Sequence, residues 1–249
     1  MFHDRTYSLL GAAPHSEPDL ATTNLSPTVR EWYSRLGMVP VSGSALKPGH
    51  LPASLCEWYA FPSAIAVASR QDRLRPMNEL EVVEDEGRQL LLFMDENQEV
   101  CRWAIPLNGG DDPQVLVGVE GGRFLPHANT FSDHIFCAVW DWLNDSPYKA
   151  GAQAAPPLPQ DLATLGSRLQ GLTTTWNWPG AENYRFAAAG LRLILWSAPR
   201  QCDWYLMADS EEAFVRAARL VLPLSNLRES LYGIDENSTS LLEQLQTRA

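Results

Sequence analysis

The sequence lacks the patterns that identify the commonest catalytic and metal sites. It contains no Gly-x-Ser-x-Gly elbow, no phosphate-binding loop with its lysine, and no Cys-x-x-Cys or paired His/Cys pattern. The five histidines are scattered, and in the nearest pair we expect His127 to precede the helix that contains His134. These absences favour a protein that is not an enzyme and that carries no metal or other cofactor.

Positive charge and long apolar runs are also scarce. The chain has 19 Lys and Arg against 30 Asp and Glu, a formal net charge of −11. Nucleic acids and anionic membranes attract basic surfaces, so neither is an expected partner. No window reaches about 18 apolar residues, and the segment 1–10 carries two charges without an apolar run, so we expect neither a membrane span nor a secretory signal.

The four cysteines are widely spaced along the chain, at Cys56, Cys101, Cys137 and Cys202. Most stand among apolar neighbours, which favours free thiols rather than disulfides. Together with the absence of a signal, this predicts a cytoplasmic protein.

The most prominent feature that the sequence does contain is an acidic stretch, residues 79–112. It has ten carboxylates and two arginines, so it carries 10 − 2, or −8, of the chain's −11. Apolar strand patterns alternate with turn signals in the same stretch, so we expect the charge to be displayed on a folded sheet. The residues that we predict to bind a partner are Glu84, Asp85, Glu86, Asp95, Glu96, Asp111 and Asp112.

Four interpretations of these acids remain open. They can form a surface for a basic protein, which opposite charge attracts and orients, or a solvated face that keeps the hairpins soluble. Asp95, Glu96, Asp111 and Asp112 could instead bind calcium, although their spacing is not that of an EF-hand. The same turns could also hold the two carboxylates of a hydrolase, which depends on a separation in space.

Apolar periodicity predicts an α+β fold with a mostly antiparallel central sheet and packed helices. After an N-terminal arm, 1–24, we expect a domain over 25–146. Its elements are helices at 26–36 and 49–60, strands at 89–94, 99–105 and 113–119, and a helix at 131–143 that Thr130 and Asp133 open as a capping box.

A Pro-, Gly- and Ala-rich segment, 147–160, is typical of a linker. Beyond it we expect a C-terminal module, 161–249, of strands followed by helices, docked on the first domain. The expected elements are a helix at 161–169, strands at 171–177, 183–188, 191–197 and 203–207, a helix at 210–222 that begins at Ser210, and a last helix at 240–247 that Ser240 and Glu243 open. Most of the nine tryptophans fall at apolar periodic positions, whereas Trp142, Trp176 and Trp178 are candidate interface anchors.

Several short motifs in residues 28–145 resemble the SUKH superfamily, which includes the cell-wall-assembly-regulator proteins. Leu51-Pro52 opens a helix that ends in Trp58-Tyr59-Ala60-Phe61. A polar turn, 96–98, lies between Leu92-Phe93 and Cys101-Arg102-Trp103. Asp111-Asp112-Pro113 precedes an apolar strand, and Asn129-Thr130-Phe131 begins the helix with Phe136 and Trp140.

The resemblance implies an α+β fold and a non-enzymatic role. Bacterial members of the family are mostly immunity proteins that neutralise toxins, often nucleases, by binding them directly, and a eukaryotic branch consists of regulatory interaction modules. We therefore expect an immunity protein whose acidic face binds a basic toxin. The alternatives are a regulatory scaffold of the same family or, from another class, a carboxylate-dependent hydrolase.

Overall fold

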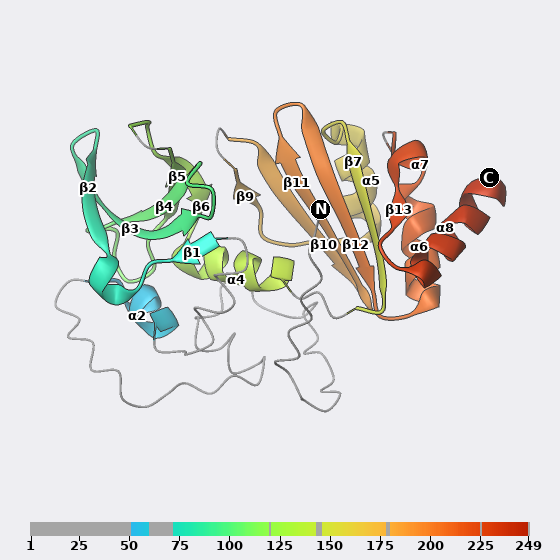
Figure 1. Cartoon of the computed structure of the whole chain (residues 1–249), viewed down its shortest axis with the longest axis horizontal. Helices are drawn as coiled ribbons and strands as arrows, with labels where there is room; N and C mark the ends of the chain where they lie inside the picture. Colours follow the sequence, from blue (N-terminus) through green and yellow to red (C-terminus); the bar gives the residue numbers. More distant parts are fainter. Residues whose placement is uncertain are drawn as a thin grey trace.

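The computed structural model describes residues 51–59, 72–119, 121–142, 146–177, 180–224 and 226–248. These residues form two antiparallel sheets with helices packed on them (Figure 1), which confirms the expected α+β class. The arm expected over 1–24 and the helix expected over 26–36 lie outside the described residues.

The first sheet is a series of antiparallel pairs in the order β1-β3-β4-β5-β6, and β2 pairs with β3. Its strands are β1 (Asp72–Leu74), β2 (Glu81–Asp85), β3 (Arg88–Glu96), β4 (Arg102–Pro106), β5 (Val115–Gly118) and β6 (Leu125–Ala128). A short 3-10 helix, η2 (Met77–Glu79), connects β1 to β2. The strands expected at 89–94, 99–105 and 113–119 are thus confirmed as β3, β4 and β5, whereas β2 was not expected because its adjacent valines break the alternation of a half-buried strand.

One face of this sheet forms a core with helices α2 (Ala53–Tyr59) and α4 (Phe131–Trp142). Trp58 of α2 makes edge-on ring contacts with Phe93 of β3 and Phe131 of α4, at centroid distances of 6.2 Å and 5.4 Å. The expected capping at the start of α4 is present, since the Asp133 N–H donates to Thr130 Oγ1 over 2.9 Å. These contacts fix both helices against the middle of β3.

The second sheet has the order β13-β7-β12-β11-β10-β8, and β9 also pairs with β10. Its strands are β7 (Tyr148–Ala154), β8 (Gln170–Gly171), β9 (Thr175–Trp176), β10 (Glu182–Ala188), β11 (Leu191–Ala198), β12 (Gln201–Ala208) and β13 (Tyr232–Gly233). The strands expected at 183–188, 191–197 and 203–207 are confirmed. The strand expected over 171–177 is instead two short strands, β8 and β9.

The linker expected over 147–160 is wrong, because residues 148–154 form β7, an internal strand paired with both β12 and β13. Its small residues serve close packing rather than flexibility. Ala150 and Ala152 are buried in the core under the helices, and a side-chain carbon at Gly151 would lie 3.1 Å from the Tyr232 hydroxyl. Alanine and glycine let the helices and β13 approach the strand closely. Because they take the place of the β-branched residues that are typical of strands, the sequence of β7 does not indicate a strand.

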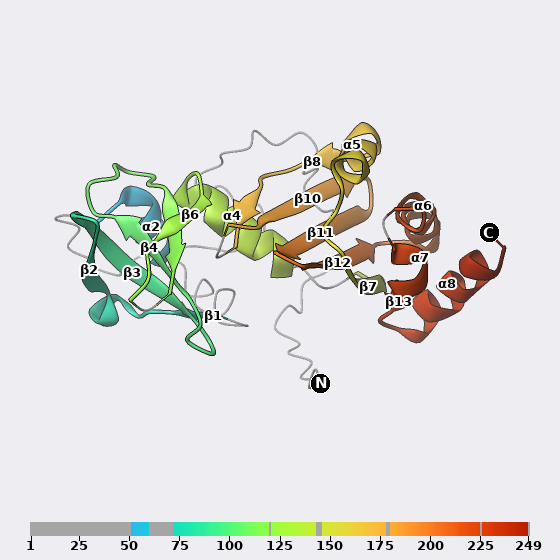
Figure 2. The ribbon, with the colours of Figure 1, turned by 90° about the horizontal axis from the view of Figure 1, so that it is seen from above.

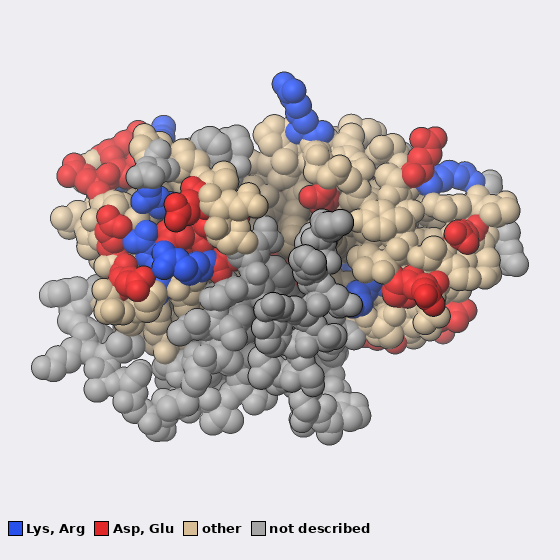
Figure 3. All heavy atoms as spheres, in the orientation of Figure 1, with Lys and Arg blue, Asp and Glu red and all other residues tan. Residues whose placement is uncertain are grey.

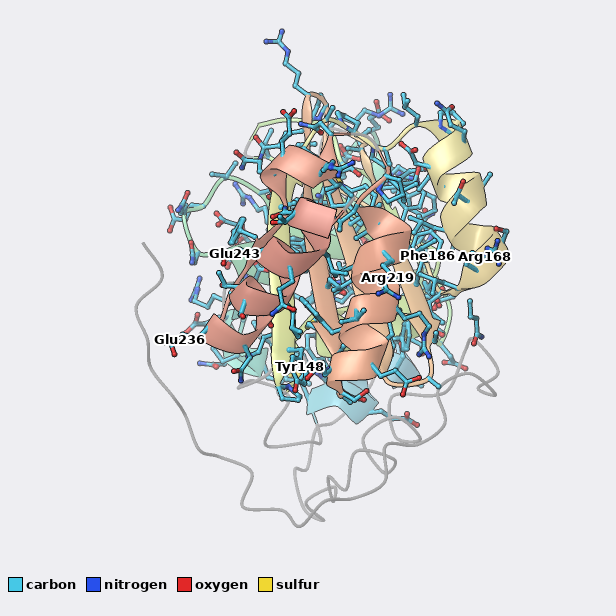
Figure 4. The ribbon with its side chains drawn as sticks, turned by 90° about the vertical axis from the view of Figure 1, so that its right-hand side faces the viewer. Tyr148, Arg168, Phe186, Arg219, Glu236 and Glu243 are labelled. Carbon is cyan, nitrogen blue, oxygen red and sulfur yellow. The ribbon has the colours of Figure 1, made fainter. Side chains whose placement is uncertain are left out.

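Four helices pack against the second sheet: α5 (Pro159–Arg168), α6 (Glu211–Val221), α7 (Leu227–Ser230) and α8 (Glu236–Arg248). Figure 4 looks onto α6 and α8, with the strands behind them. Among the described residues, their core contains 23 buried apolar residues against 14 in the first core. The C-terminal module includes β7, which lies outside the range expected for it, and all four of its helices contribute residues to this hydrophobic core.

Two helix starts in this module can be compared with expectation. Ser210 caps α6, since its Oγ accepts a hydrogen bond from the Ala213 N–H over 3.2 Å. The last helix begins earlier than Ser240, because Asp235 accepts hydrogen bonds from the Ser238 N–H and hydroxyl over 2.8 Å and 2.6 Å. An aspartate is an equally good cap, and it precedes the pattern that we used.

Helix α4 lies between the two sheets, as the two perpendicular views of the ribbon show (Figures 1 and 2). Phe131, Ile135 and Val139 face the first core, whereas Phe136, Cys137 and Trp140 pack against Ala187, Ile194 and Met207 of the second sheet. A helix that buries apolar residues on both sides belongs to two cores at once. The docking that we expected between the two modules therefore occurs through α4.

Candidate functional site

The seven acids that the sequence nominated as partner-binding residues do not share one environment. Glu84, Glu86, Asp111 and Asp112 are exposed, Glu96 is half-buried, and Asp85 and Asp95 are each 8% exposed. Figure 3 shows acidic side chains over the hairpin of β2 and β3, with arginines interleaved among the acids nearby. Exposure and pairing therefore divide the group into residues that can meet a partner and residues that hold the sheet.

Asp95 is a structural acid. Its carboxylate accepts hydrogen bonds from Arg75 Nε and Nη2, both at 2.8 Å, and from Arg73 Nη2 at 2.9 Å. Arg75 also reaches Glu81 Oε2 at 2.9 Å, which ties β1, β2 and β3 together. Hydrogen bonding to Asp95 raises the pKa of Arg75, so this guanidinium stays charged and neutralises part of the acidic stretch.

Asp85 is structural as well. One of its oxygens pairs with Arg88, directly across the hairpin turn, and the other accepts the Phe124 N–H at 3.4 Å. The turn itself is Glu86-Gly87, with φ of 50° and 78°. Two consecutive positive φ values are those of a two-residue type I′ hairpin turn. Gly87 adopts this conformation without strain, and Glu86 is exposed to solvent.

Asp111 and Asp112 lie at the starts of two helices. The Asp111 carbonyl accepts the Ser54 N–H of α2 at 3.0 Å, and Asp112 Oδ1 accepts the Ser132 N–H of α4 at 2.9 Å. A carboxylate at a helix start satisfies a free N–H and meets the positive end of the helix dipole. These two residues thus have a role in the fold, although their exposure leaves them able to meet a partner.

Glu96 belongs to a pair of neighbouring carboxyl groups at the edge of β3. Its Oε2 accepts the N–H groups of Gln98 and Val100, which closes the turn to β4. Burial, and next the charge of Glu96, raises the pKa of Asp72 opposite it to about 7. Asp72 is therefore partly protonated near neutral pH and adds less negative charge than its formal value.

The net charge of this surface is less negative when the flanking residues, which include three more arginines, are counted with the acidic stretch. Over residues 72–124 there are twelve acids and five arginines, so the surplus is 12 − 5, or −7. The surface remains acidic, and in the described part of the chain five of these twelve carboxylates pair with a guanidinium: Glu79, Glu81, Asp85, Glu86 and Asp95. Among the described residues, Glu84 is an exposed acid without an ion pair.

A cavity of about 430 Å³ opens beside the hairpin, and we call it the hairpin pocket. Its floor is apolar, with Val83, Leu92 and Phe124. Charged residues also line it, with Glu84 and Glu86 from the hairpin and Arg102 and Arg123 from neighbouring segments, and Arg123 pairs with Glu86 over 3.4 Å. An apolar floor with a few charged groups at the rim is typical of a binding site.

The sequence analysis missed this pocket, although one signal for it was present. A side-chain carbon at Gly118 would lie 2.9 Å from the Phe124 ring, so only glycine leaves room for that ring. Phe124 packs with Leu90 and Leu92 on the sheet face opposite to α2 and α4. Gly118 falls within the strand expected over 113–119, and its contact with Phe124 is visible only in three dimensions.

A second polar cluster lies where β6 and α4 meet the second module, and it is buried. His127 Nδ1 donates to the Trp176 carbonyl over 2.7 Å, which leaves its Nε2 to accept from His134 Nδ1 over 3.1 Å. His134 Nε2 then has no hydrogen-bond partner among the described atoms. Burial is the first cause that lowers the pKa of both histidines, to about 4 for His127, and the charge of Arg185 lowers both further.

Arg185 completes this cluster by pairing with Asp141 and by donating to the Thr173 carbonyl and the Thr175 hydroxyl. His127 and Arg185 each have a partner across the junction between the two modules, and His134 is joined to the cluster through His127. We therefore interpret the cluster as the polar joint between the sheets rather than as a catalytic site.

No group of three or more His, Cys, Asp or Glu side chains in the described parts of the chain is arranged to hold a metal ion. The four acids considered for calcium have other contacts, with arginines for Asp95 and helix starts for Asp111 and Asp112. Of the candidate anchors, Trp176 is half-buried and its Nε1 donates to Glu182, whereas the side chains of Trp142 and Trp178 lie outside the described part. Trp58, Trp103, Trp140 and Trp204 are core residues, as expected.

Comparison with known proteins adds no relative: no family profile, curated protein or solved structure matches the chain. None of the helices that the structure describes has the length and apolarity needed to cross a bilayer.

Proposed function

We propose that the protein is a non-enzymatic binding module that receives a basic protein partner at the β2–β3 hairpin and the hairpin pocket. The observation that carries the proposal is the combination of the pocket's apolar floor with the exposed carboxylates of the hairpin, Glu86 beside the pocket and Glu84 on the other face of β2. Lys and Arg side chains have an apolar stem and a cationic end, so one of them can cover Phe124 while its charge meets a carboxylate.

The charge of the surface supports the same conclusion. The surplus of −7 over residues 72–124 is most of the chain's −11. Long-range attraction of this kind raises the association rate with a basic protein more than it raises the final affinity. Asp85 and Asp95 contribute by holding the hairpin in shape, so we reassign them from direct contacts to positioning residues.

Within the resemblance to the SUKH superfamily, the corresponding role is immunity: the module occludes a basic toxin, such as a nuclease, in the cytoplasm. The four free cysteines are in keeping with a reducing compartment. A regulatory scaffold of the same family would use the same surface without a toxin, and the identity of the captured protein distinguishes the two. A hydrolase receives less support, because Asp95 is engaged by two arginines.

The experiment is capture from the native host's lysate at low and high salt, followed by mass spectrometry and by association kinetics with the purified partner. Charge reversal of the exposed pair, Glu84→Lys with Glu86→Lys, is expected to slow association about tenfold or more at low salt and to flatten its salt dependence. The matched control is Glu243→Lys on the exposed side of α8, in the other module.

A basic toxin captured by the wild type and by the control, but not by the reversed pair, would support the immunity role. A basic regulatory protein with the same pattern would support the scaffold. If the association rate at low salt is the same for all three proteins, the acidic surface does not bind the partner and the proposal fails.

A further inference from the structure

β2 is an outer strand of the first sheet, paired to β3 along one side (Figures 1 and 2). It has five residues, more than any other outermost strand among the described residues: β6 has four, β1 three, and β8, β9 and β13 two each. The opposite edge, β6, is occupied because His127 bonds to Trp176 of β9. β2 therefore presents the longest open edge of backbone in the described part of the molecule.

The hairpin register shows which backbone groups face outward. In a two-residue hairpin the residues that flank the turn, here Asp85 and Arg88, exchange hydrogen bonds, and such pairs alternate with non-bonded ones. Val83 with Leu90 is then bonded, whereas Glu84 with Gln89 and Val82 with Leu91 are not. The Gln89 carbonyl confirms this phase, because it points away from β2 and accepts the Leu107 N–H over 3.1 Å. The N–H and C=O groups of Val82 and Glu84 consequently point away from β3.

The side chains on this edge fit one kind of occupant. Val82 is 52% exposed, and it lies on the same face of the strand as Glu84, which has no ion pair among the described residues. β2 contains no lysine, proline or bulge, which are the usual devices that protect an edge from pairing. A second copy of β2 would bring Glu81, Glu84 and Asp85 against their own kind, so like charge disfavours a homodimer through this edge.

We propose that β2 accepts an extended basic segment of the partner as an additional antiparallel strand, bonded to the backbone of Val82 and Glu84. This inference rests on the proposed function and specifies how the partner is held. The bound segment carries an apolar or β-branched residue opposite Val82 and a Lys or Arg opposite Glu84, two positions away on the same face. Backbone pairing supplies the affinity and these two side-chain contacts supply the selectivity.

The test uses a capped peptide, Lys-Thr-Val-Thr-Lys-Thr-Val-Lys, and two N-methylated versions of it. Opposite β2, the first two Lys and the two Val, at alternate positions of the peptide, turn their N–H groups toward the protein, whereas the three Thr turn away. Strand addition predicts that methylation of the first set abolishes binding and that methylation of the Thr set leaves it within about threefold of the parent peptide. Amide exchange at Val82 and Glu84 is expected to slow when the parent peptide binds.

Protein variants provide an independent readout. Val82→Pro removes an outward N–H and is tolerated at an edge, whereas Val82→Thr keeps that N–H. We expect Val82→Pro to weaken peptide binding about tenfold or more, and Val82→Thr to change it by less than about threefold. Near-ultraviolet circular dichroism of the buried tryptophans checks that both variants fold. If the proline variant does not fold, the binding of the two N-methylated peptides to the wild-type protein tests strand addition.

The outcomes separate this inference from the function on which it rests. If both methylated peptides bind as well as the parent, and Glu84→Lys still weakens binding, the surface binds basic chains by charge alone: strand addition is overturned and the proposed function stands. If no peptide binds and charge reversal leaves capture of the partner unchanged, both are overturned.

Discussion

Arg185 and Asp141 form a two-pronged ion pair inside the molecule, with Nε to Oδ1 at 2.7 Å and Nη2 to Oδ2 at 2.6 Å. Arg185 belongs to β10 and Asp141 to α4, so the pair crosses the junction between the second sheet and the shared helix. Their side chains are 3% and 9% exposed. Trp196 of β11 donates to the same carboxylate over 3.1 Å.

Loss of one member of this pair leaves a buried charge without its counter-ion. We expect Arg185→Leu to lower the free energy of unfolding by about 3–5 kcal/mol, as measured by urea denaturation. The double variant, Asp141→Leu with Arg185→Leu, removes both charges and is expected to recover a large part of that loss. If the double variant loses as much free energy of unfolding as the sum of what Arg185→Leu and Asp141→Leu lose separately, the two residues are not coupled and the prediction is contradicted.

The buried histidines give the stability a pH dependence of defined sign. The pKa of His127 is lowered to about 4, and that of His134 is lowered well below its usual value, so the unfolded chain binds protons first as pH falls. Their stabilising contribution is complete above the unfolded value of about 6.5 and is lost as pH falls toward 4. Each histidine contributes a slope of about 1.4 kcal/mol per pH unit in that window.

The measurement is the free energy of unfolding from urea titrations at several pH values between about 7 and 4.5. His134→Phe keeps an aromatic ring in contact with Trp58 and Phe93 and removes one titrating group, so it is expected to lower the slope by about 1.4 kcal/mol per pH unit. An unchanged slope in this variant would show that other groups control the acid response.

The sequence predicted the elements whose local signals agree with their tertiary setting. Helix α4 has a cap, an acidic first turn and apolar periodicity, and β10, β11 and β12 are apolar strands separated by turn residues. Where tertiary packing overrides local propensity, the prediction failed. β7 was interpreted as a linker because close packing against helices and Tyr232 selects the small residues that otherwise mark flexible chain.

The sequence predicted where the acidic surface lies, but not which of its acids hold the fold together. Charge density located the β2–β3 hairpin correctly as an acidic surface. It could not show that Arg73 and Arg75, outside the acidic stretch, fold back onto Asp95, since that contact depends on the register of β1 against β3. Nor could it reveal the joining of His127 to His134, because one lies in a strand and the other in a helix.

The difference between structural and exposed acids has a measurable consequence. Asp95→Ala leaves Arg75, which is 13% exposed, without its main partner, and we expect it to lower the free energy of unfolding by about 3 kcal/mol. Glu84→Lys changes an exposed residue without an ion pair among the described residues, and is expected to shift it by less than about 0.5 kcal/mol. Urea denaturation at one pH measures both, and equal losses would contradict the division of the acids into two classes.

Two glycines allow a matched test of how the hairpin pocket is built. Gly118→Ala places a methyl group 2.9 Å from the Phe124 ring, so the ring must move. We expect a loss of about 1–3 kcal/mol in the free energy of unfolding and a weakened response to basic peptides. Gly166→Ala changes an exposed position of α5 with no atom within 4 Å, and is expected to stabilise the protein by about 0.4–1 kcal/mol without any effect on peptide binding. If Gly118→Ala retains both stability and peptide binding, Phe124 is free to shift and the floor of the pocket does not depend on Gly118.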